Sequence, residues 1–181
     1  QNVDLQADKD VTVNNGVISA TAGSVNMNAV NDVTINNGNI TANAVNVTAP
    51  ELLVNDGVIK AATLEASQKM TLAGGKVNAA NVIATGTMDI TGSTVDTGTG
   101  EGLVKAASVN MTVGQVNGNV LNVIATGDFA QSGGSINATS ANLTAGQDIA
   151  QSDGSVSATT VNLTAGGAIN QTAGSIVATN T

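Results

Sequence analysis

Apolar and polar residues alternate over short stretches along most of this chain, and Gly or Asn interrupts the alternation at regular intervals. Ala141, Leu143 and Ala145, for example, are apolar or small, and the residues between them are polar. Strict alternation is typical of a β-strand with one buried face. β-Branched residues and Asn dominate, and a 3.6-residue period is absent, which argues against helices. The pattern therefore predicts an all-β protein.

The alternating stretches recur with a period of twenty residues. Three such units follow one another without a gap between residues 121 and 180. We align the segment 25–44 in the same frame, which gives Val25 the position of Val161. Each unit is expected to hold three short strands, near its positions 1–5, 8–12 and 15–18. The corners between them carry a recurring Gly, the residue that best tolerates the positive φ of a tight turn.

A fixed period with three strands per unit predicts a coil that returns to a point directly above its start. The rise per coil is then one strand spacing, roughly 4.8 Å. A β-sandwich is the alternative, since the Asn-Gly pairs at 15–16 and 37–38 also suit hairpin turns. A sandwich, however, needs no fixed period. We expect a single-stranded parallel β-helix (a β-solenoid) of about nine coils.

The regularity of the repeat varies along this one expected domain, residues 1–181. Near the middle, Val109 to Val120 looks like a truncated turn of the repeat, and the segment TGTGEG looks like an insertion. We therefore divide the domain into regular coils at 3–44 and 121–181, irregular coils at 45–120, and an insertion at 97–102.

Polar residues between the inward positions are expected to point outward and to stack on their counterparts in the next coil. Position 2 of the unit is Asn six times, and position 4 is repeatedly Thr. Stacked amide side chains can form hydrogen-bonded ladders. A face of this kind could also order water or ice, or bind a glycan, although other residues interrupt its Thr columns. The candidate face comprises Asn26, Asn46, Asn110, Asn122, Asn142, Asn162, Thr48, Thr144 and Thr164.

Composition excludes much catalytic chemistry. The chain has a single aromatic residue, Phe129, and no Trp, Tyr, His, Cys or Arg. Nucleophilic dyads and thiolate or imidazole metal sites are therefore ruled out, and we expect no catalytic residue, cofactor or metal. The net charge of −8 argues against nucleic acid as a partner. No apolar run approaches the roughly 18 to 20 residues of a membrane span, so we expect no membrane insertion.

Carboxylates remain as possible chemistry, because paired acids suffice for glycoside hydrolysis. A β-helical carbohydrate-active enzyme is therefore an alternative function. Its candidate residues are Asp89 with Asp96, and the group Asp4, Asp8, Asp10 and Asp32. Acids at position 8 of the unit could also stack and attract a calcium ion; these are Asp10, Asp32, Asp128 and Asp148. We interpret all of them as turn residues.

The units ANLTAGQDIAQSDGSVSATT and VNLTAGGAINQTAGSIVATN resemble the repeats of filamentous-haemagglutinin-type exoproteins, the bacterial adhesins exported by two-partner secretion. The resemblance is good over residues 1–44 and 121–181 and loose over 45–120. It implies that the parallel β-helix is right-handed, which agrees with the general right-handed preference of parallel crossovers. It also implies secretion or display on the outer bacterial surface, with host or matrix glycans and proteins as partners. The Asn-Pro-Asn motif of that family's secretion domain is absent, so the resemblance is to the repeat shaft.

An open β-helix leaves strand edges unpaired at its two ends, and such edges normally need a cap. The pattern predicts no polar capping helix at either end. Two explanations stay open: the chain is a slice of a longer shaft, or separate subunits stack head-to-tail into a filament. Both predict a structural or adhesive extracellular protein.

Overall fold

The computed structural model describes residues 1–179, which form β-strands and turns without any helix. The strands are β1 (Val3–Ala7), β2 (Val11–Asn14), β3 (Val17–Ala29), β4 (Asp32–Asn36), β5 (Asn39–Thr48), β6 (Glu51–Asn55), β7 (Val58–Ala66), β8 (Lys69–Ala73), β9 (Lys76–Ala84), β10 (Thr87–Asp96), β11 (Glu101–Ala106), β12 (Ser108–Asn117), β13 (Val120–Ala125), β14 (Phe129–Ala145), β15 (Ile149–Ala165), β16 (Ile169–Gln171) and β17 (Ser175–Ala178).

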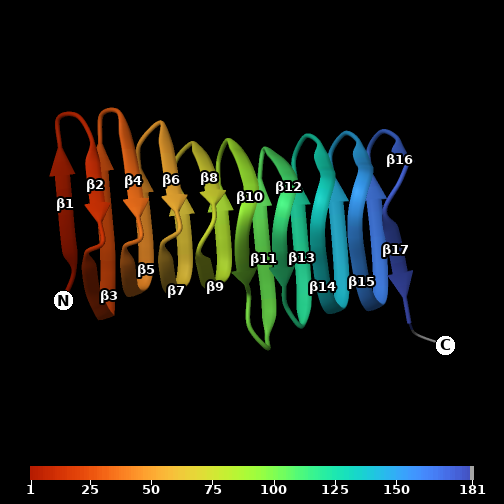
Figure 1. Cartoon of the computed structure of the whole chain (residues 1–181), viewed down its shortest axis with the longest axis horizontal. Coiled ribbons are helices and arrows are strands. Elements are labelled where there is room, and N and C mark those ends of the chain that lie inside the picture. The colour runs from red at the N-terminus through yellow and green to blue at the C-terminus, as the bar shows by residue number, and fades with distance from the viewer. Residues whose placement is uncertain (180–181) are drawn as a thin grey trace.

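Every strand pairs in parallel with a strand of a neighbouring coil, and the coils stack side by side into a rod (Figure 1). Val3 pairs with Val25, 22 residues later, and Leu64 pairs with Val82, 18 residues later. At the C-terminal end, Leu143 pairs with Leu163, 20 residues later. The parallel β-solenoid of about nine coils predicted from the twenty-residue period is therefore confirmed.

Each coil has three sides, and each side contributes an inward column of one residue per coil. Side A is defined by Val3, Val25, Val45, Leu64, Val82, Val104, Val123, Leu143 and Leu163. Side B is defined by Val11, Val33, Leu52, Met70, Met88, Val109, Phe129, Ile149 and Ile169. Side C is defined by Ile18, Ile40, Ile59, Val77, Val95, Val116, Ile136, Val156 and Ile176.

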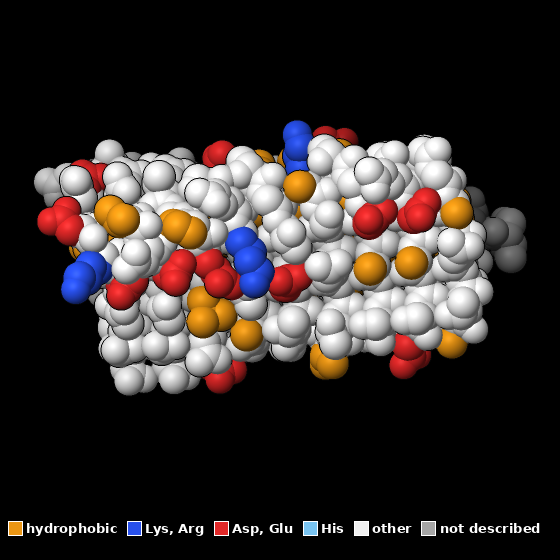
Figure 2. Space-filling model, turned by 90° about the horizontal axis from the view of Figure 1, so that it is seen from above, with side chains coloured by type: hydrophobic (Ala, Val, Ile, Leu, Met, Phe, Trp, Pro, Cys, Tyr) orange, Lys and Arg blue, Asp and Glu red, His pale blue; other side chains and the backbone are white. Residues whose placement is uncertain are grey.

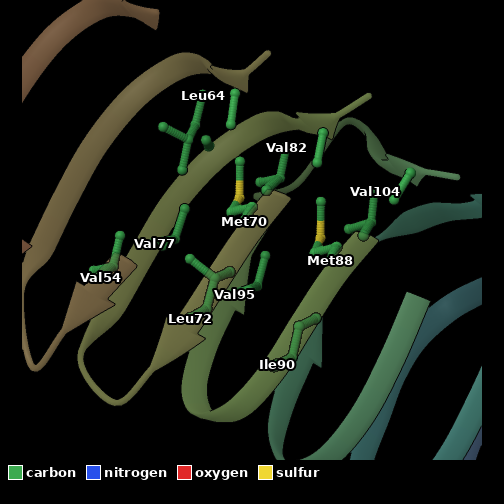
Figure 3. Packing of buried hydrophobic residues seen from close by; sticks show 14 of the residues in the cluster. Val54, Leu64, Met70, Leu72, Val77, Val82, Met88, Ile90, Val95 and Val104 are labelled. Carbon is green, nitrogen blue, oxygen red and sulfur yellow. The ribbon is translucent and has the colours of Figure 1, made fainter. Parts of the chain in front are cut away.

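The inward side chains form one continuous apolar core, in which each residue packs on its counterpart one coil away. Met70 stacks on Met88, and Leu72 stacks on Ile90, all fully buried (Figure 3). The lone aromatic residue, Phe129, fits into the side B column and is 2% exposed. Burial of apolar surface is the main stabilising term in folding, and here it repeats along the rod axis.

The alignment of Val25 with Val161 is wrong by two residues. Val25 belongs to the column of Leu163, whereas Val161 lies two residues before that column. The cause is that two corners change in length along the rod: the corner between sides A and B becomes two residues shorter, and the corner between sides C and A becomes longer. Val25 and the side B residue Val33 are eight apart, but Leu143 and Ile149 are six apart. The corner between sides C and A lengthens in compensation, so the period stays near twenty.

The expected truncated turn between Val109 and Val120 is also wrong. Val109 and Val116 occupy the side B and side C columns, and Val104 on β11 completes side A of the same coil. This coil is therefore complete. The insertion is a real loop at 97–100, between β10 and β11. It projects beyond the neighbouring corners (Figure 1), so the extra residues do not disturb the core.

Candidate functional site

The nine residues of the candidate outward face lie in several columns. Asn110 directly follows Val109 on β12 and therefore lies on side B. The other eight lie on side A, where the two-residue change of frame divides them between neighbouring columns. Asn122, Asn142 and Asn162 form one column. Asn26 and Asn46 share a second column with Thr144 and Thr164, and Thr48 stacks on Asn28 in a third.

The amide groups in these columns bond to one another across coils. Asn142 Nδ2 donates to Asn122 Oδ1 over 2.9 Å, and Asn162 Nδ2 donates to Asn142 Oδ1 over 2.8 Å. Asn46 bonds to Asn26 in the same way over 2.8 Å. Each amide on this outward face therefore uses part of its hydrogen-bonding capacity on a neighbouring coil, which leaves less of that capacity for an external ligand.

Replacement of Asn142 by alanine is expected to lower the free energy of unfolding by about 1–2 kcal/mol, because it removes two hydrogen bonds at once. Urea-induced unfolding, followed by circular dichroism, measures this loss. Thr144→Ala is the matched control, since Thr144 lies on the same strand and is exposed. Its expected effect is within about 0.5 kcal/mol. Equal losses in the two variants would contradict a stabilising amide ladder.

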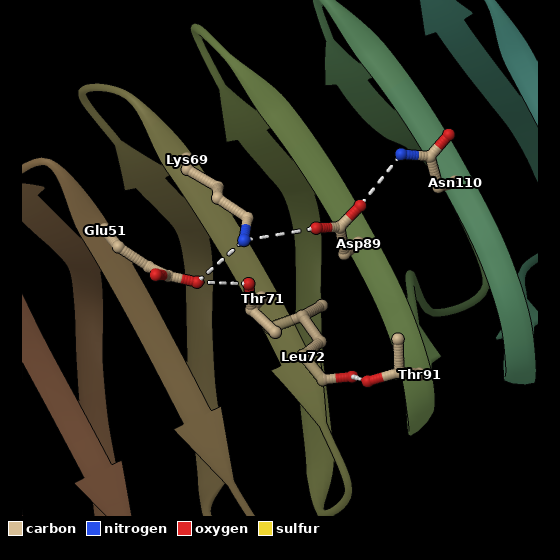
Figure 4. Close-up of polar contacts among 7 residues, drawn as sticks. All are labelled: Glu51, Lys69, Thr71, Leu72, Asp89, Thr91 and Asn110. Carbon is tan, nitrogen blue, oxygen red and sulfur yellow. Dashed lines mark hydrogen bonds and ion pairs between the residues drawn. The ribbon is translucent and has the colours of Figure 1, made fainter.

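Charged side chains gather on side B. Lys69 Nζ lies 3.1 Å from Glu51 Oε1 and 3.4 Å from Asp89 Oδ2, and Asn110 Nδ2 donates to Asp89 Oδ1 (Figure 4). Figure 2 shows acidic side chains in a row along part of the rod with a lysine among them, and further acidic side chains elsewhere on the same view. The hydrogen bond to Glu51 raises the pKa of Lys69, desolvation lowers it to a smaller extent, and Asp89 raises it further.

The ion pairs of Lys69 predict a small pH effect on stability. Since folding raises its pKa above the ordinary value of 10.5, the stabilisation is complete below that pH and is lost as the pH rises through the raised pKa. Lys69→Met should therefore destabilise the protein by less than about 1 kcal/mol, because the ion pairs are partly exposed and solvent screens them. Urea unfolding of both proteins from about pH 8 to about pH 12 should show the two curves converging. A constant difference would contradict the ion-pair role.

The structure does not bring together the carboxylates of Asp89 and Asp96. Asp89 lies on side B, where it pairs with Thr71 and is held by Lys69. Asp96 lies on side C, after the bend of β10, and its Oδ1 accepts a hydrogen bond from the Gly98 N–H at 3.0 Å. The two acids therefore face different surroundings and do not form a pair across a common cleft.

Three of the four acids at position 8 of the unit bond to the backbone of the following coil. Asp128 Oδ1 accepts from the N–H of Asp148 at 3.0 Å, and Asp148 Oδ1 accepts from the N–H of Ala168 at 2.7 Å. Asp10 bears the same relation to the N–H of Asp32, at 3.4 Å. Within residues 1–179 no group of three or more acidic side chains is placed to hold a metal ion. Asp10, Asp128 and Asp148 therefore each satisfy a corner N–H group, which is a more specific role than general turn propensity.

A buried polar column was not expected from the sequence. Gln131 and Gln151 point into the core of side B and are 1% and 4% exposed. Gln151 Nε2 donates to Gln131 Oε1 at 3.2 Å and to the corner carbonyl of Gly154 at 3.3 Å. Gln171 repeats the corner bond with Gly174. Each glutamine thus ties its strand to the glycine corner that follows it. A glutamine recurs every twenty residues, each time two residues after an inward position. This recurrence is the sequence signal that marks the column.

Two shallow hollows flank the insertion loop. One, of about 270 Å³, is lined by groups that include Lys60, Asn78 and Asp96. The other, of about 560 Å³, is lined by groups that include Asn117 and Asn119 as well as Asp96. Amide, ammonium and carboxylate groups can hydrogen-bond a hydroxylated ligand. These hollows are open to solvent, and Asp96 is shared by both.

No helix capable of crossing a membrane occurs in the described part of the chain. The chain was also compared with models of protein families, with curated proteins and with solved structures. None of the three comparisons gives a match.

Proposed function

We propose that this chain is a structural or adhesive shaft segment of an extracellular fibre, in which the solenoid serves as a stiff spacer. The observation that supports this proposal is the unbroken stacking of the inward columns. Side B, for example, passes from Val11 to Ile169 through every coil, including the irregular ones. A core that repeats along one axis resists bending, because a bend must open backbone ladders on one side.

The surface is consistent with a spacer. Asn side chains in its outward columns bond to one another along the rod, and the insertion is accommodated outside the core. The half-exposed apolar residues of the end coils, such as Leu5 and Leu163, suit coverage by a further coil, either from more repeats of the same polypeptide or from a second copy.

The location is tested by labelling intact cells that produce the protein with antibodies raised against residues 1–179. We expect a signal on unpermeabilised cells that external protease removes. Detection only after permeabilisation would refute an extracellular shaft. An antibody against a cytosolic protein of the same cells provides the control for membrane integrity.

The alternative of a carbohydrate-active enzyme is tested separately. We propose a non-catalytic role, since Asp89 and Asp96 lie on different sides of the coil. Polysaccharides incubated with the chain should therefore release no more reducing ends than with the double variant Asp89→Asn, Asp96→Asn. Release that depends on either carboxylate would instead support glycoside hydrolysis.

A further inference from the structure

The Lys69 ammonium contacts Glu51 on the preceding coil and Asp89 on the following one. All other hydrogen bonds between side chains of neighbouring coils run in one direction in the described part of the chain. The donor is on the later coil and the acceptor on the earlier one. Asn26 donates to Asp4 on side A, and Asn110 donates to Asp89 on side B. The same direction holds for the other pairs, Asn36 to Asn14, Asn46 to Asn26, Asn55 to Asn36, Thr71 to Glu51, Asn81 to Thr63, Asn137 to Asn117, Asn142 to Asn122, Gln151 to Gln131 and Asn162 to Asn142.

This direction makes the two end faces of the rod complementary. In the first coil, Asn2 and Asn14 use their Oδ1 atoms as acceptors for the following coil. Their Nδ2 groups have no acceptor among residues 1–179. In the last coil, Asn162 uses its Nδ2 as a donor, and its Oδ1 has no donor in the same range. One face thus offers amide donors, and the other offers an amide acceptor.

The apolar columns match across the same two faces. Val3 and Leu5 on the first coil are only partly buried, as are Leu163 and Ala165 on the last. Val3 and Leu163 belong to one column. Asn2 precedes Val3 just as Asn162 precedes Leu163, so the complementary amide groups also share a column.

We propose that a second copy of the chain stacks head-to-tail on the first, with Leu163 of one copy over Val3 of the next. Asn2 Nδ2 of the added copy then donates to Asn162 Oδ1, and the parallel ladder continues across the junction. This inference rests on the proposed function as a shaft and names its partner.

Charge supports this orientation over the alternatives. The first coil carries Asp4, Asp8 and Asp10, with Lys9 as the single nearby cation, whereas residues 161–179 carry no charged side chain. Two N-terminal faces brought together would oppose these acids, and like charges in close contact destabilise an interface. Two C-terminal faces brought together would place acceptors such as Asn162 Oδ1 against one another. The strands that meet at the junction would also be antiparallel, unlike every pair within the rod.

Disulfide trapping tests the proposal, because the chain contains no cysteine. Asp4 and Thr164 share an outward column of side A. In the stacked pair their Cα atoms would lie about 4.8 Å apart, within the range of a disulfide. We expect a mixture of the single variants Asp4→Cys and Thr164→Cys to form covalent dimers under mild oxidation, much faster than either variant alone.

Thr144→Cys is the matched control, since Thr144 precedes Thr164 by one coil in the same column. Mixed with Asp4→Cys, it should form no dimer faster than either variant alone. Dimers that form equally fast from one variant by itself, or with Thr144→Cys, would overturn the head-to-tail arrangement. A chain that remains monomeric in sedimentation at its highest soluble concentration would overturn it as well.

Gln171 provides a second, independent test. At the junction its side chain would lie over Val13 of the next copy, since both belong to the column that contains Gln131. Its Oε1 would then be buried without a donor, which is unfavourable. Gln171→Leu should therefore tighten self-association about tenfold. Unchanged or weaker association, measured by sedimentation equilibrium, would contradict the proposed register.

The two proposals fail in different ways. A monomer that scatters X-rays as a short rod and labels the cell surface would refute stacking and leave the shaft intact. Covalent dimers of the expected kind, from a protein found only inside cells, would refute the extracellular shaft and leave stacking intact.

Discussion

Leu72→Ala is expected to lower the free energy of unfolding by about 2–5 kcal/mol, the range for a buried leucine truncated in a packed core. Leu72 is fully buried, between Val54 and Ile90 in its column. The inward column allows little collapse, because the backbone ladders hold the coils above and below at a fixed spacing. A cavity should therefore remain, and chemical denaturation would measure the loss.

The matched control is Leu53→Ala. Leu53 lies on the neighbouring coil, one position from an inward residue, and its side chain is directed outward and only partly buried. The expected loss is under about 1 kcal/mol, since little apolar surface becomes exposed. Similar losses at Leu53 and Leu72 would contradict the assignment of inward and outward faces.

Gly75→Ala is expected to destabilise the protein by about 2–4 kcal/mol, through two causes that add. Gly75 has a φ of +77°, which costs a residue with a side chain about 1–2 kcal/mol. A Cβ at this position would also overlap the carbonyl oxygen of Gly57 in the preceding coil. Relief of such a clash must move the backbone, at a cost of about 1–3 kcal/mol.

Gly100→Ala separates these causes from the general effect of removing a glycine. Gly100 lies in the insertion loop, where an added Cβ meets no atom within 4 Å. Its substitution should be neutral within about 0.5 kcal/mol. If Gly75→Ala and Gly100→Ala had the same midpoint of thermal unfolding, the corner geometry would not be a determinant of stability.

The fold could be predicted because inward positions repeat. Ile136, Val156 and Ile176 recur every twenty residues, and the alternation around them fixes which face is buried. Corner lengths could not be predicted in the same way. The sequence shows a turn residue at a corner, but does not show whether the inward residues on its two sides are six positions apart, as Leu143 and Ile149 are, or eight, as Val25 and Val33 are. The two-residue error in the frame follows from this.

The polar columns were harder to place for a related reason. Asn142 and Asn26 follow similar apolar residues, yet the change of corner lengths puts them in neighbouring columns. Gln131 and Gln151 are buried although they are polar, because each amide finds a corner carbonyl three residues later. Hydrophobic patterning alone assigns such residues to the surface. Only the three-dimensional position of the glycine corner reveals the partner.

At the glycine corners, the left-handed backbone is provided by different residues along the rod. Asn15 and Asn37 have φ values of 50° and are followed by Gly16 and Gly38, which do not need a positive φ themselves. Towards the C-terminus, glycines such as Gly154 adopt the positive φ directly. Asn tolerates this conformation better than most residues. The recurring glycine therefore marks the corner correctly but has two different roles.

Stacking of each coil only on its neighbours determines how the rod responds to mechanical force. A pull applied through the two chain termini acts on one terminal coil at a time, so the coils peel off in sequence. Each of them releases about 20 residues, or roughly 70 Å of extended chain. A pull applied through whole end faces instead loads the hydrogen bonds of all three sides together. The strength of such a fibre therefore depends on how each segment is attached to the next.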